Sequence, residues 1–309
     1  MFNKKKRPYR VNELSDGWNL AFTVVVSIIA VATIMPVLLV VAVSLSTAED
    51  LAVNGYQFIP KHLSLGAYAG LLKTGQAIWR GYAMTIFYAF TGTVLSLFVM
   101  SMFAYVLARK DYPLRRFLTM AAFFPTLFGG GLVPTYMLNT QILNLDNSIW
   151  IFLLPGTVAV FNVIILRTFM QSGVPGDLME AARIDGANDW QIYARIMMPL
   201  SKAGLATIAL FKVIGVWNEW FTGILYVEER NQHLRPVMTL LQSMQKNIEA
   251  LKNDPALSTD PGAAAQLAAM PTESTQMAIT FLVSLPLLVA YPFFQKYFVK
   301  GMTIGSVKG

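Results

Sequence analysis

Six strongly apolar stretches, separated by polar segments, dominate the chain. Each approaches or exceeds the roughly 20 residues that an α-helix needs to cross the hydrocarbon core of a bilayer. The pattern predicts six transmembrane helices, at about residues 18–44, 81–107, 117–138, 148–170, 203–226 and 276–298. We therefore expect an all-α polytopic membrane protein.

The polar segments divide the chain further. We expect a single membrane domain, residues 18–298, between an N-terminal tail of residues 1–17 and a C-terminal tail of residues 299–309. A polar loop at residues 175–200 and a longer one at 227–275 separate the later spans. The longer loop has apolar residues at helical spacing, which predicts an amphipathic helix: Val237, Leu240, Leu241, Met244, Ile248 and Leu251. Residues 253–261 and 262–269 indicate a turn and a short helix.

Composition supports a membrane protein and limits its chemistry. The 309 residues are 55% hydrophobic and only 13% charged, whereas soluble domains carry about 25% charged residues. The chain contains no cysteine and only two histidines. Disulfides, thiolate metal sites and histidine-based catalysis are therefore not expected.

The distribution of positive charge predicts the orientation in the membrane. Most of the 24 lysines and arginines lie in the N-terminal tail and in the segments that follow the second, fourth and sixth spans. Because cytoplasmic segments are enriched in positive charge, both termini and the 175–200 loop are predicted to be cytoplasmic. This distribution also accounts for the net charge of +7 without a nucleic-acid partner.

The 175–200 loop is expected to form two short helices hinged at Gly186. Pro175 suits a first helical turn, and Gly186 stands where the first helix should stop, a position that often requires positive φ. Asn188 and Gln191 have the spacing of a capping box for the second helix. Pro199 is expected to end that helix.

The same loop resembles a known motif. Glu180-Ala181-Ala182, then Gly186, Ile196 and Met198-Pro199 follow the spacing of the EAA loop of ABC-importer permeases. One position departs from that pattern, since Met198 stands where leucine is usual, and this volume-conserving change is expected to be harmless.

The resemblance implies a function for the loop. In that family it holds the coupling helices that seat on a cytoplasmic ATPase. The residues carried over to this role are Glu180, Ala181, Ala182, Asp185, Gly186, Trp190 and Pro199. It also implies partners: a second permease, two ATPase subunits that bind ATP and Mg²⁺, and an extracytoplasmic solute-binding protein. This chain itself would bind no cofactor and catalyse no reaction, consistent with the lack of a phosphate-binding loop motif.

The C-terminal residues narrow the resemblance to the carbohydrate branch. The run Phe298-Val299-Lys300-Gly301 and the Lys308-Gly309 ending are similar to the end of the second permease of maltose and oligosaccharide importers. The resemblance implies a bacterial cytoplasmic membrane location and contact of Lys300, Gly301 and Lys308 with the ATPase. Alternatively, the basic tail is only a positive-inside anchor.

Two groups of residues are candidates for the translocation pathway. Lys212, Trp217, Asn218 and Glu219 lie in the fifth span, where ionisable residues usually face a bundle interior or a cavity; Trp217 could stack on a sugar ring. They could equally form a structural pair or bond neighbouring helices. Gly129, Gly130 and Gly131 interrupt the third span beside Pro125 and Pro134, and they permit either close substrate approach or helix packing.

Other functions remain as alternatives. An ABC permease for a peptide or phosphate would share the loop but not the sugar-type tail. An ion-coupled carrier acting alone would need no docking loop. A membrane-embedded enzyme is disfavoured, because the spans lack paired carboxylates and histidine clusters.

Overall fold

The computed structural model describes residues 16–252 and 273–306, and this part of the chain is helical, with one isolated β-bridge between Ser46 and Leu63. It divides into two compact units. The first comprises the chain up to Leu71 together with Pro271–Phe281, and the second comprises Leu72–Met270 and Leu282–Gly309. Residues 253–269, which the sequence assigns to a turn and a short helix, lie outside the described residues.

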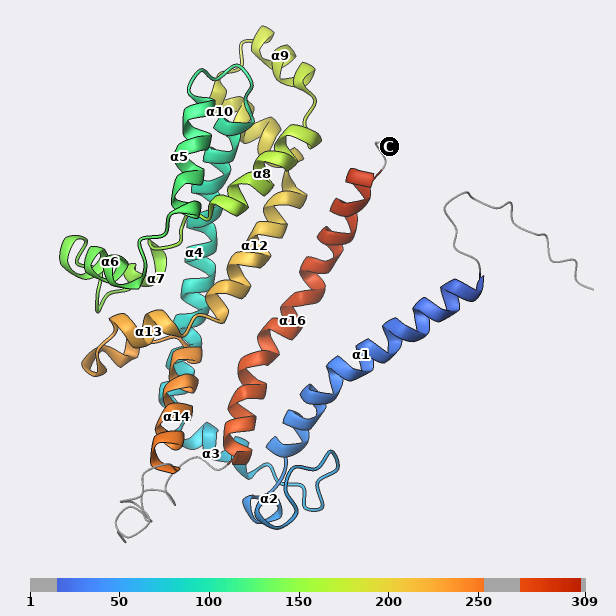
Figure 1. The fold of residues 1–309 in the computed structure, drawn as a ribbon, viewed down its shortest axis with the longest axis vertical. Helices are drawn as coiled ribbons and strands as arrows, with labels where there is room; N and C mark the ends of the chain where they lie inside the picture. Colours follow the sequence, from blue (N-terminus) through green and yellow to red (C-terminus); the bar gives the residue numbers. More distant parts are fainter. Residues whose placement is uncertain (1–15, 253–272, 307–309) are drawn as a thin grey trace, which may run out of the picture. The chain divides into compact units, whose positions relative to one another are not determined.

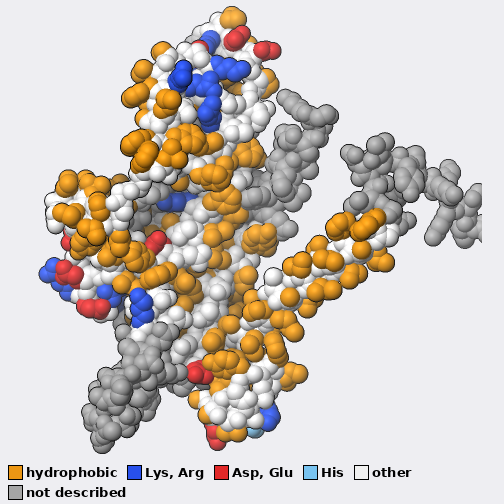
Figure 2. Space-filling model, in the orientation of Figure 1, with side chains coloured by type: hydrophobic (Ala, Val, Ile, Leu, Met, Phe, Trp, Pro, Cys, Tyr) orange, Lys and Arg blue, Asp and Glu red, His pale blue; other side chains and the backbone are white. Residues whose placement is uncertain are grey.

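The first unit contains α1 (Asp16–Ser44), α2 (Ala48–Asn54), the beginning of α3 (Gly66–Thr74) and the beginning of α16 (Glu273–Ser306). The α1 helix is apolar all round and exposed along most of its length (Figures 1 and 2). Such a helix requires lipid or another protein around it. Pro36 lies within α1 without ending it.

The second unit is built around α4 (Gln76–Ala108). This helix packs against α8 (Val160–Gly173), α12 (Lys202–Trp217) and α14 (Val237–Lys252), as Figure 1 shows. A buried cluster joins one end of α4 to α8, with Met100, Ala104, Val163 and Leu166 at its centre. A second cluster joins the other end to α7 (Trp150–Leu153), where Tyr88 stacks on Phe152 at 4.5 Å.

The amphipathic helix predicted in the 227–275 segment is present as α14. It follows α13 (Phe221–Tyr226) and a short 3₁₀ helix, η3 (Glu229–Leu234). Val237 and Leu241 are buried. The contact between α14 and α4 is close because Gly81 lies in it: a Cβ atom there would come within 3.0 Å of the Val237 Cα atom.

Three described helices are long and apolar enough to cross a membrane: Gly17–Ser44, Gln76–Ala108 and Glu273–Pro292. The number rises to five if each of two bent helix pairs counts as one span. One pair is α5 (Arg115–Leu127) with α6 (Leu132–Met137) and the π-helix η1 (Leu138–Ile142), bent by 115°. The break predicted in the third span is thus confirmed.

Two expected spans are less continuous than predicted. The stretch 148–170 is split between α7 and α8 by an irregular segment that contains Pro155 and Gly156, which has a φ of +72°. Proline and a left-handed glycine both interrupt a helix, which accounts for the break. The stretch 203–226 is likewise split between α12 and α13. By contrast, α16 continues past the expected end of the sixth span, to Ser306.

Candidate functional site

The 175–200 loop folds as two short helices around Gly186, as predicted. Pro175 precedes α9 (Gly176–Ile184), and Gly186 follows it with a φ of +83°. The N–H of Ala187 donates to the carbonyl of Ala182 (2.9 Å), and that of Gly186 donates to Arg183 (3.0 Å). These two bonds form a Schellman motif, whose left-handed position favours glycine.

The predicted capping box is confirmed. The N–H of Gln191 donates to the Asn188 side chain at 2.8 Å, and the N–H of Asn188 donates to the Gln191 side chain at 2.9 Å. This box opens α10 (Asp189–Ile192). Two backbone N–H groups at the helix start, those of Asn188 and Gln191, are thereby satisfied.

The second helix ends at Leu200, one residue after Pro199 and close to the predicted end. The helical path continues from α10 through the π-helix η2 (Tyr193–Met197) and α11 (Met198–Leu200), and Pro199 lies inside α11. Pro199 stands in the first turn of α11, where a missing N–H costs little. The chain then bends by 78° into α12.

The loop has one buried face and one exposed face. Ile192, Tyr193 and Met197 are buried against the α4–α8 cluster, and the Tyr193 hydroxyl lies 2.8 Å from that of Ser101 on α4. On the other side Leu178, Ile184 and Trp190 are 43%, 86% and 55% exposed. Glu180, Ala181 and Asp185 are also exposed, whereas Ala182 is partly buried.

Four charged side chains fasten the loop to the end of α4. Arg109 contacts both Asp111 and Asp189 at 2.7 Å, and Arg183 contacts Asp111 at 3.0 Å and Asp189 at 3.9 Å. We call these four residues the ionic cluster. The hydrogen bond from Arg109 holds the pKa of Asp111 well below its usual range, although partial burial opposes this shift. Hydrogen bonds to Asp111 and Asp189 likewise raise the pKa of Arg109.

Sequence reasoning did not find the ionic cluster. In the sequence, Arg109 and Asp111 belong to a short basic segment. Their partners in the 175–200 loop, Asp189 and Arg183, lie more than 70 positions further along the chain. The one local signal is the Arg-x-Asp spacing directly after a span, which brings the two side chains of Arg109 and Asp111 together.

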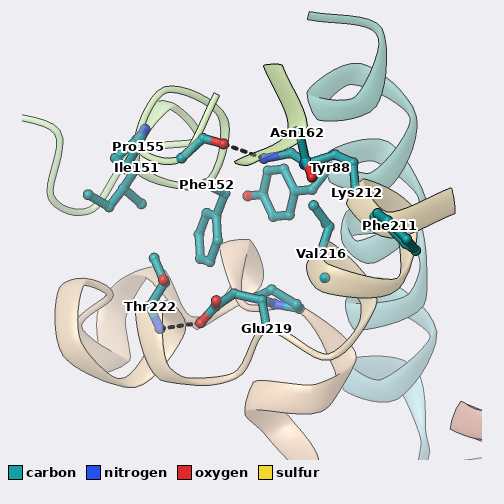
Figure 3. Close-up of a pocket in the computed structure, with 13 residues that line it drawn as sticks. Tyr88, Ile151, Phe152, Pro155, Asn162, Phe211, Lys212, Val216, Glu219 and Thr222 are labelled. Carbon is teal, nitrogen blue, oxygen red and sulfur yellow. Dashed lines mark hydrogen bonds between the residues drawn. The ribbon is translucent and has the colours of Figure 1, made fainter. Parts of the chain in front are cut away.

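A cavity of about 280 Å³ lies in the second unit between α4, α7, α8 and α12 (Figure 3). We call it the membrane cavity. The Nζ atom of Lys212 donates to the carbonyl of Gly156 at 2.9 Å, and the Glu219 carboxylate accepts from the N–H of Thr222 at 2.9 Å. In Figure 3 the rings of Tyr88 and Phe152 lie between these two charged groups. Asn162 also lines the cavity, and its amide has no hydrogen-bond partner among the described residues.

The remaining pathway candidates are placed differently. Trp217 is buried; its indole N–H donates to the carbonyl of Val283 at 2.8 Å, and it does not line the membrane cavity. Asn218 donates to Ile214. The expectation that Lys212 and Glu219 share one helix is wrong, because α12 ends at Trp217 and Glu219 lies in the break before α13. Both nevertheless line the same cavity.

The three predicted glycines and the predicted tail residues are found as follows in the structure. Gly129, Gly130 and Gly131 are exposed in the break between α5 and α6, where Gly131 has a φ of +85°. Lys300 and Gly301 fall within the backbone of α16, and Lys308 lies outside the described residues. Within the described residues, no group of three histidine or acidic side chains could hold a metal ion.

Known proteins resemble this chain over most of its length. Residues 92–304 match the family described as binding-protein-dependent transport system inner membrane component. The chain is 34% identical over 298 residues to the polygalacturonan/rhamnogalacturonan transport system permease protein YtcP of Bacillus subtilis, covering 96% of this chain and 99% of that protein. It is 26% identical over 293 residues to the arabinooligosaccharides transport system permease protein AraQ of Halalkalibacterium halodurans, covering 93% and 95%.

A solved structure matches over nearly the whole length. It is a crystal structure of a bacterial ABC transporter involved in the import of the acidic polysaccharide alginate. One of its chains aligns with a TM-score of 0.78 and 28% sequence identity, covering 94% of this chain and all of that chain. With the family match, this similarity shows that the chain belongs to the inner-membrane components of binding-protein-dependent transport systems, among relatives that are permeases of sugar ABC importers.

Proposed function

We propose that this chain is one of two permease subunits of an ATP-driven, binding-protein-dependent importer of oligosaccharides in the bacterial cytoplasmic membrane. A related permease completes the pathway, two ATPase subunits bind ATP and Mg²⁺, and an extracytoplasmic binding protein delivers the sugar. The observation that carries this proposal is the 175–200 loop, a braced pair of helices that exposes Leu178, Ile184 and Trp190.

The exposed face of the loop suits a docking surface. Large apolar side chains grouped on a polar segment favour a protein partner over water. Glu180 and Asp185 are exposed on the same loop and can bond to the ATPase, and Ala181 permits close helix approach. The ionic cluster and the buried side of the loop tie the dock to α4, so that movement of the ATPase is transmitted to a helix that spans the membrane.

The full topology forms part of the proposal. Six spans within residues 18–298 leave the two tails and the 175–200 loop in the cytoplasm and the 227–275 loop outside. The family assignment and the positive charge near the loop support this arrangement. The tail, with Lys300, Gly301 and Lys308, then lies on the same side as the ATPase.

The membrane cavity is the proposed part of the pathway. It combines Lys212, the Asn162 amide, which has no partner among the described residues, and aromatic rings; together they match the charged, hydroxylated and apolar faces of a sugar ring. Lys212 forms no ion pair with a described carboxylate within 4.0 Å. Glu219 lines the same cavity and attracts Lys212 electrostatically, but it lies beyond ion-pair distance. The ammonium group can therefore still pair with an anionic group of a substrate. The break at Gly129–Gly131 is a second, exposed candidate for the pathway.

These features favour an acidic oligosaccharide as substrate. The names of two similar proteins mention acidic polymers, polygalacturonan in one case and alginate in the other. The carboxylate of a uronic acid residue fits beside Lys212. Neutral oligosaccharides, as in the name of the arabinooligosaccharide permease, are the second candidate.

Uptake by the assembled importer in proteoliposomes tests the proposal. The complex with its partner subunits should import oligogalacturonate only when ATP and the binding protein are present. Lys212→Gln keeps a donor for the Gly156 carbonyl but removes the charge. We expect it to reduce uptake of the acidic sugar about tenfold and to leave uptake of a neutral oligosaccharide of equal length unchanged.

Two results would contradict the proposal. Uptake driven by an ion gradient without ATP would exclude an ABC importer. Equal loss of acidic and neutral sugar uptake in Lys212→Gln would mean that Lys212 only supports the turn at Gly156.

A further inference from the structure

A pocket separate from both sites lies where α5 begins. It measures about 280 Å³ and is lined by Arg115, Arg116, Thr119 and Met120 of α5 and by Arg167 of α8. We call it the arginine pocket. Figure 2 shows basic side chains gathered at this end of the second unit, around α5, α9 and α10. Neither the docking face nor the membrane cavity uses these arginines.

The positive charge of the arginine pocket is not balanced within the described residues. None of its three guanidinium groups lies within 4.0 Å of a described carboxylate. Asp111, the nearest acidic residue in sequence, is already bonded to Arg109 and Arg183. The Nε atom of Arg167 is buried and has no hydrogen-bond partner in the part of the chain that the structure describes. A buried donor without a partner is costly, so an anion would stabilise the pocket.

The helix start adds to this positive field. Arg115 is the first residue of the 13-residue α5 helix, and Leu114 before it provides no side-chain cap. The N–H of Arg115 already donates to the carbonyl of Tyr112 at 3.2 Å, but the positive end of the helix dipole still favours an anion there. Guanidinium groups suit phosphate in particular, because each can donate two parallel hydrogen bonds.

An apolar strip continues from the arginine pocket along α5. Phe117, Met120, Phe124 and Leu127 recur at helical spacing, and each is between 61% and 74% exposed. The adjoining ligand should therefore have a charged head and a long apolar part. An acidic segment of a soluble protein matches the arginines but not this strip.

We propose that the arginine pocket binds the phosphate of an anionic phospholipid in the cytoplasmic leaflet, with an acyl chain along the apolar strip of α5. Basic pockets between membrane helices on the cytoplasmic side bind such headgroups. The proposal rests on the topology given above, which places the start of α5 at the cytoplasmic face.

Native mass spectrometry of the assembled importer in nanodiscs tests the site. The nanodiscs contain phosphatidylcholine with a minor fraction of phosphatidylglycerol, and bound phosphatidylglycerol is counted on the complex. Arg167→Gln is compared with Lys202→Gln, which removes one charge from an exposed residue at the start of α12. We expect about tenfold lower occupancy in Arg167→Gln and wild-type occupancy in Lys202→Gln.

Further variants make the result decisive. Arg167→Lys keeps the charge but not the paired donors, and it should bind with intermediate occupancy. Arg115→Gln provides a second removal of pocket charge if Arg167→Gln does not assemble. Equal phosphatidylglycerol occupancy in all variants would overturn the site. Unchanged lipid binding together with loss of the ATPase from the arginine variants would also overturn it, because that result would indicate an acidic protein partner. Because lipid is counted without transport, failure here leaves the proposed import function untouched.

Discussion

A single backbone angle at Gly186 fixes the relation between the two short helices of the 175–200 loop. Its φ of +83° closes the Schellman motif of α9, and no atom lies within 4 Å of the position that a Cβ atom would occupy. Space therefore does not select glycine here. The left-handed conformation does, since it costs roughly 1–2 kcal/mol for most other residues.

Substitutions of Gly186 should separate conformation from size. Gly186→Val should reduce several-fold the ATP hydrolysis that loaded binding protein stimulates, because a β-branched residue resists positive φ. Gly186→Asn should stay near wild type, since asparagine tolerates this region. Stimulated ATPase activity of the reconstituted complex measures both. Equal activity of the two variants would contradict a role for the backbone angle.

At the scale of elements, the ionic cluster joins the end of α4 to α9 and α10. Arg109 is the central residue: its side chain is only 16% exposed, and it bonds two carboxylates. Exposed ion pairs contribute little on their own, but a paired guanidinium network contributes more. The ionic cluster therefore positions the 175–200 loop against α4 and also stabilises it there.

A double-mutant cycle tests this connection. Arg109→Gln and Asp189→Asn should each lower stimulated ATP hydrolysis, and the double variant should lose less than the sum of both. The coupling energy should be about 1 kcal/mol. Strictly additive losses would mean that the two residues act independently. Arg195→Gln, which removes an exposed charge outside the cluster, is the matched control.

A second cycle, of Arg109→Gln with Asp111→Asn, should give a coupling energy that does not depend on pH between about 5 and 8. The pKa of Asp111 is lowered in the folded protein. A lowered carboxyl pKa gives stability that is present above the unfolded value, near 3.9, and is lost only as pH falls through the folded value. The Asp111 carboxylate thus remains ionised and bonded to Arg109 throughout this range. A coupling energy that falls on going from pH 7.5 to about 5.5 would contradict this.

The packing of α14 on α4 depends on Gly81. An alanine Cβ there would lie 2.8 Å from Leu240 and 3.0 Å from the Val237 backbone, whereas at Gly92 on the same helix the nearest atom is 3.7 Å away. Gly81→Ala should therefore destabilise by about 1–3 kcal/mol, while Gly92→Ala should be neutral or slightly stabilising. The thermal midpoints of the two purified variants provide the measurement. A midpoint for Gly81→Ala at or above that of Gly92→Ala would contradict close packing there.

Local features of these elements could be predicted, and long-range ones could not. Gly186 and the Asn188–Gln191 box follow from residues a few positions apart, so their spacing predicts the geometry. The breaks in α7–α8 and α12–α13 were not expected, because apolar composition alone does not distinguish a continuous helix from a broken one. The ionic cluster depends on the packing of α4 beside the 175–200 loop, which the sequence pattern does not contain.

At the scale of the whole molecule, the high apolar content of the sequence is matched by many exposed apolar side chains in the structure. The α1 helix exposes Trp18, Ile28 and many other apolar side chains along its length. In water such a surface would be unstable, but lipid or a second permease can cover it. In the proposed topology the 175–200 loop lies at the cytoplasmic face, where it can meet the ATPase.

Labelling of single cysteines in intact cells tests this orientation most directly, because the chain has no cysteine of its own. Ile184→Cys and Ile59→Cys replace side chains that are 86% and 83% exposed. Ile184 lies in the 175–200 loop, and Ile59 lies between the first two predicted spans. A membrane-impermeant maleimide should label Ile59→Cys from outside and should label Ile184→Cys only after the membrane is opened. Labelling of Ile184→Cys in intact cells would contradict a cytoplasmic dock for the ATPase.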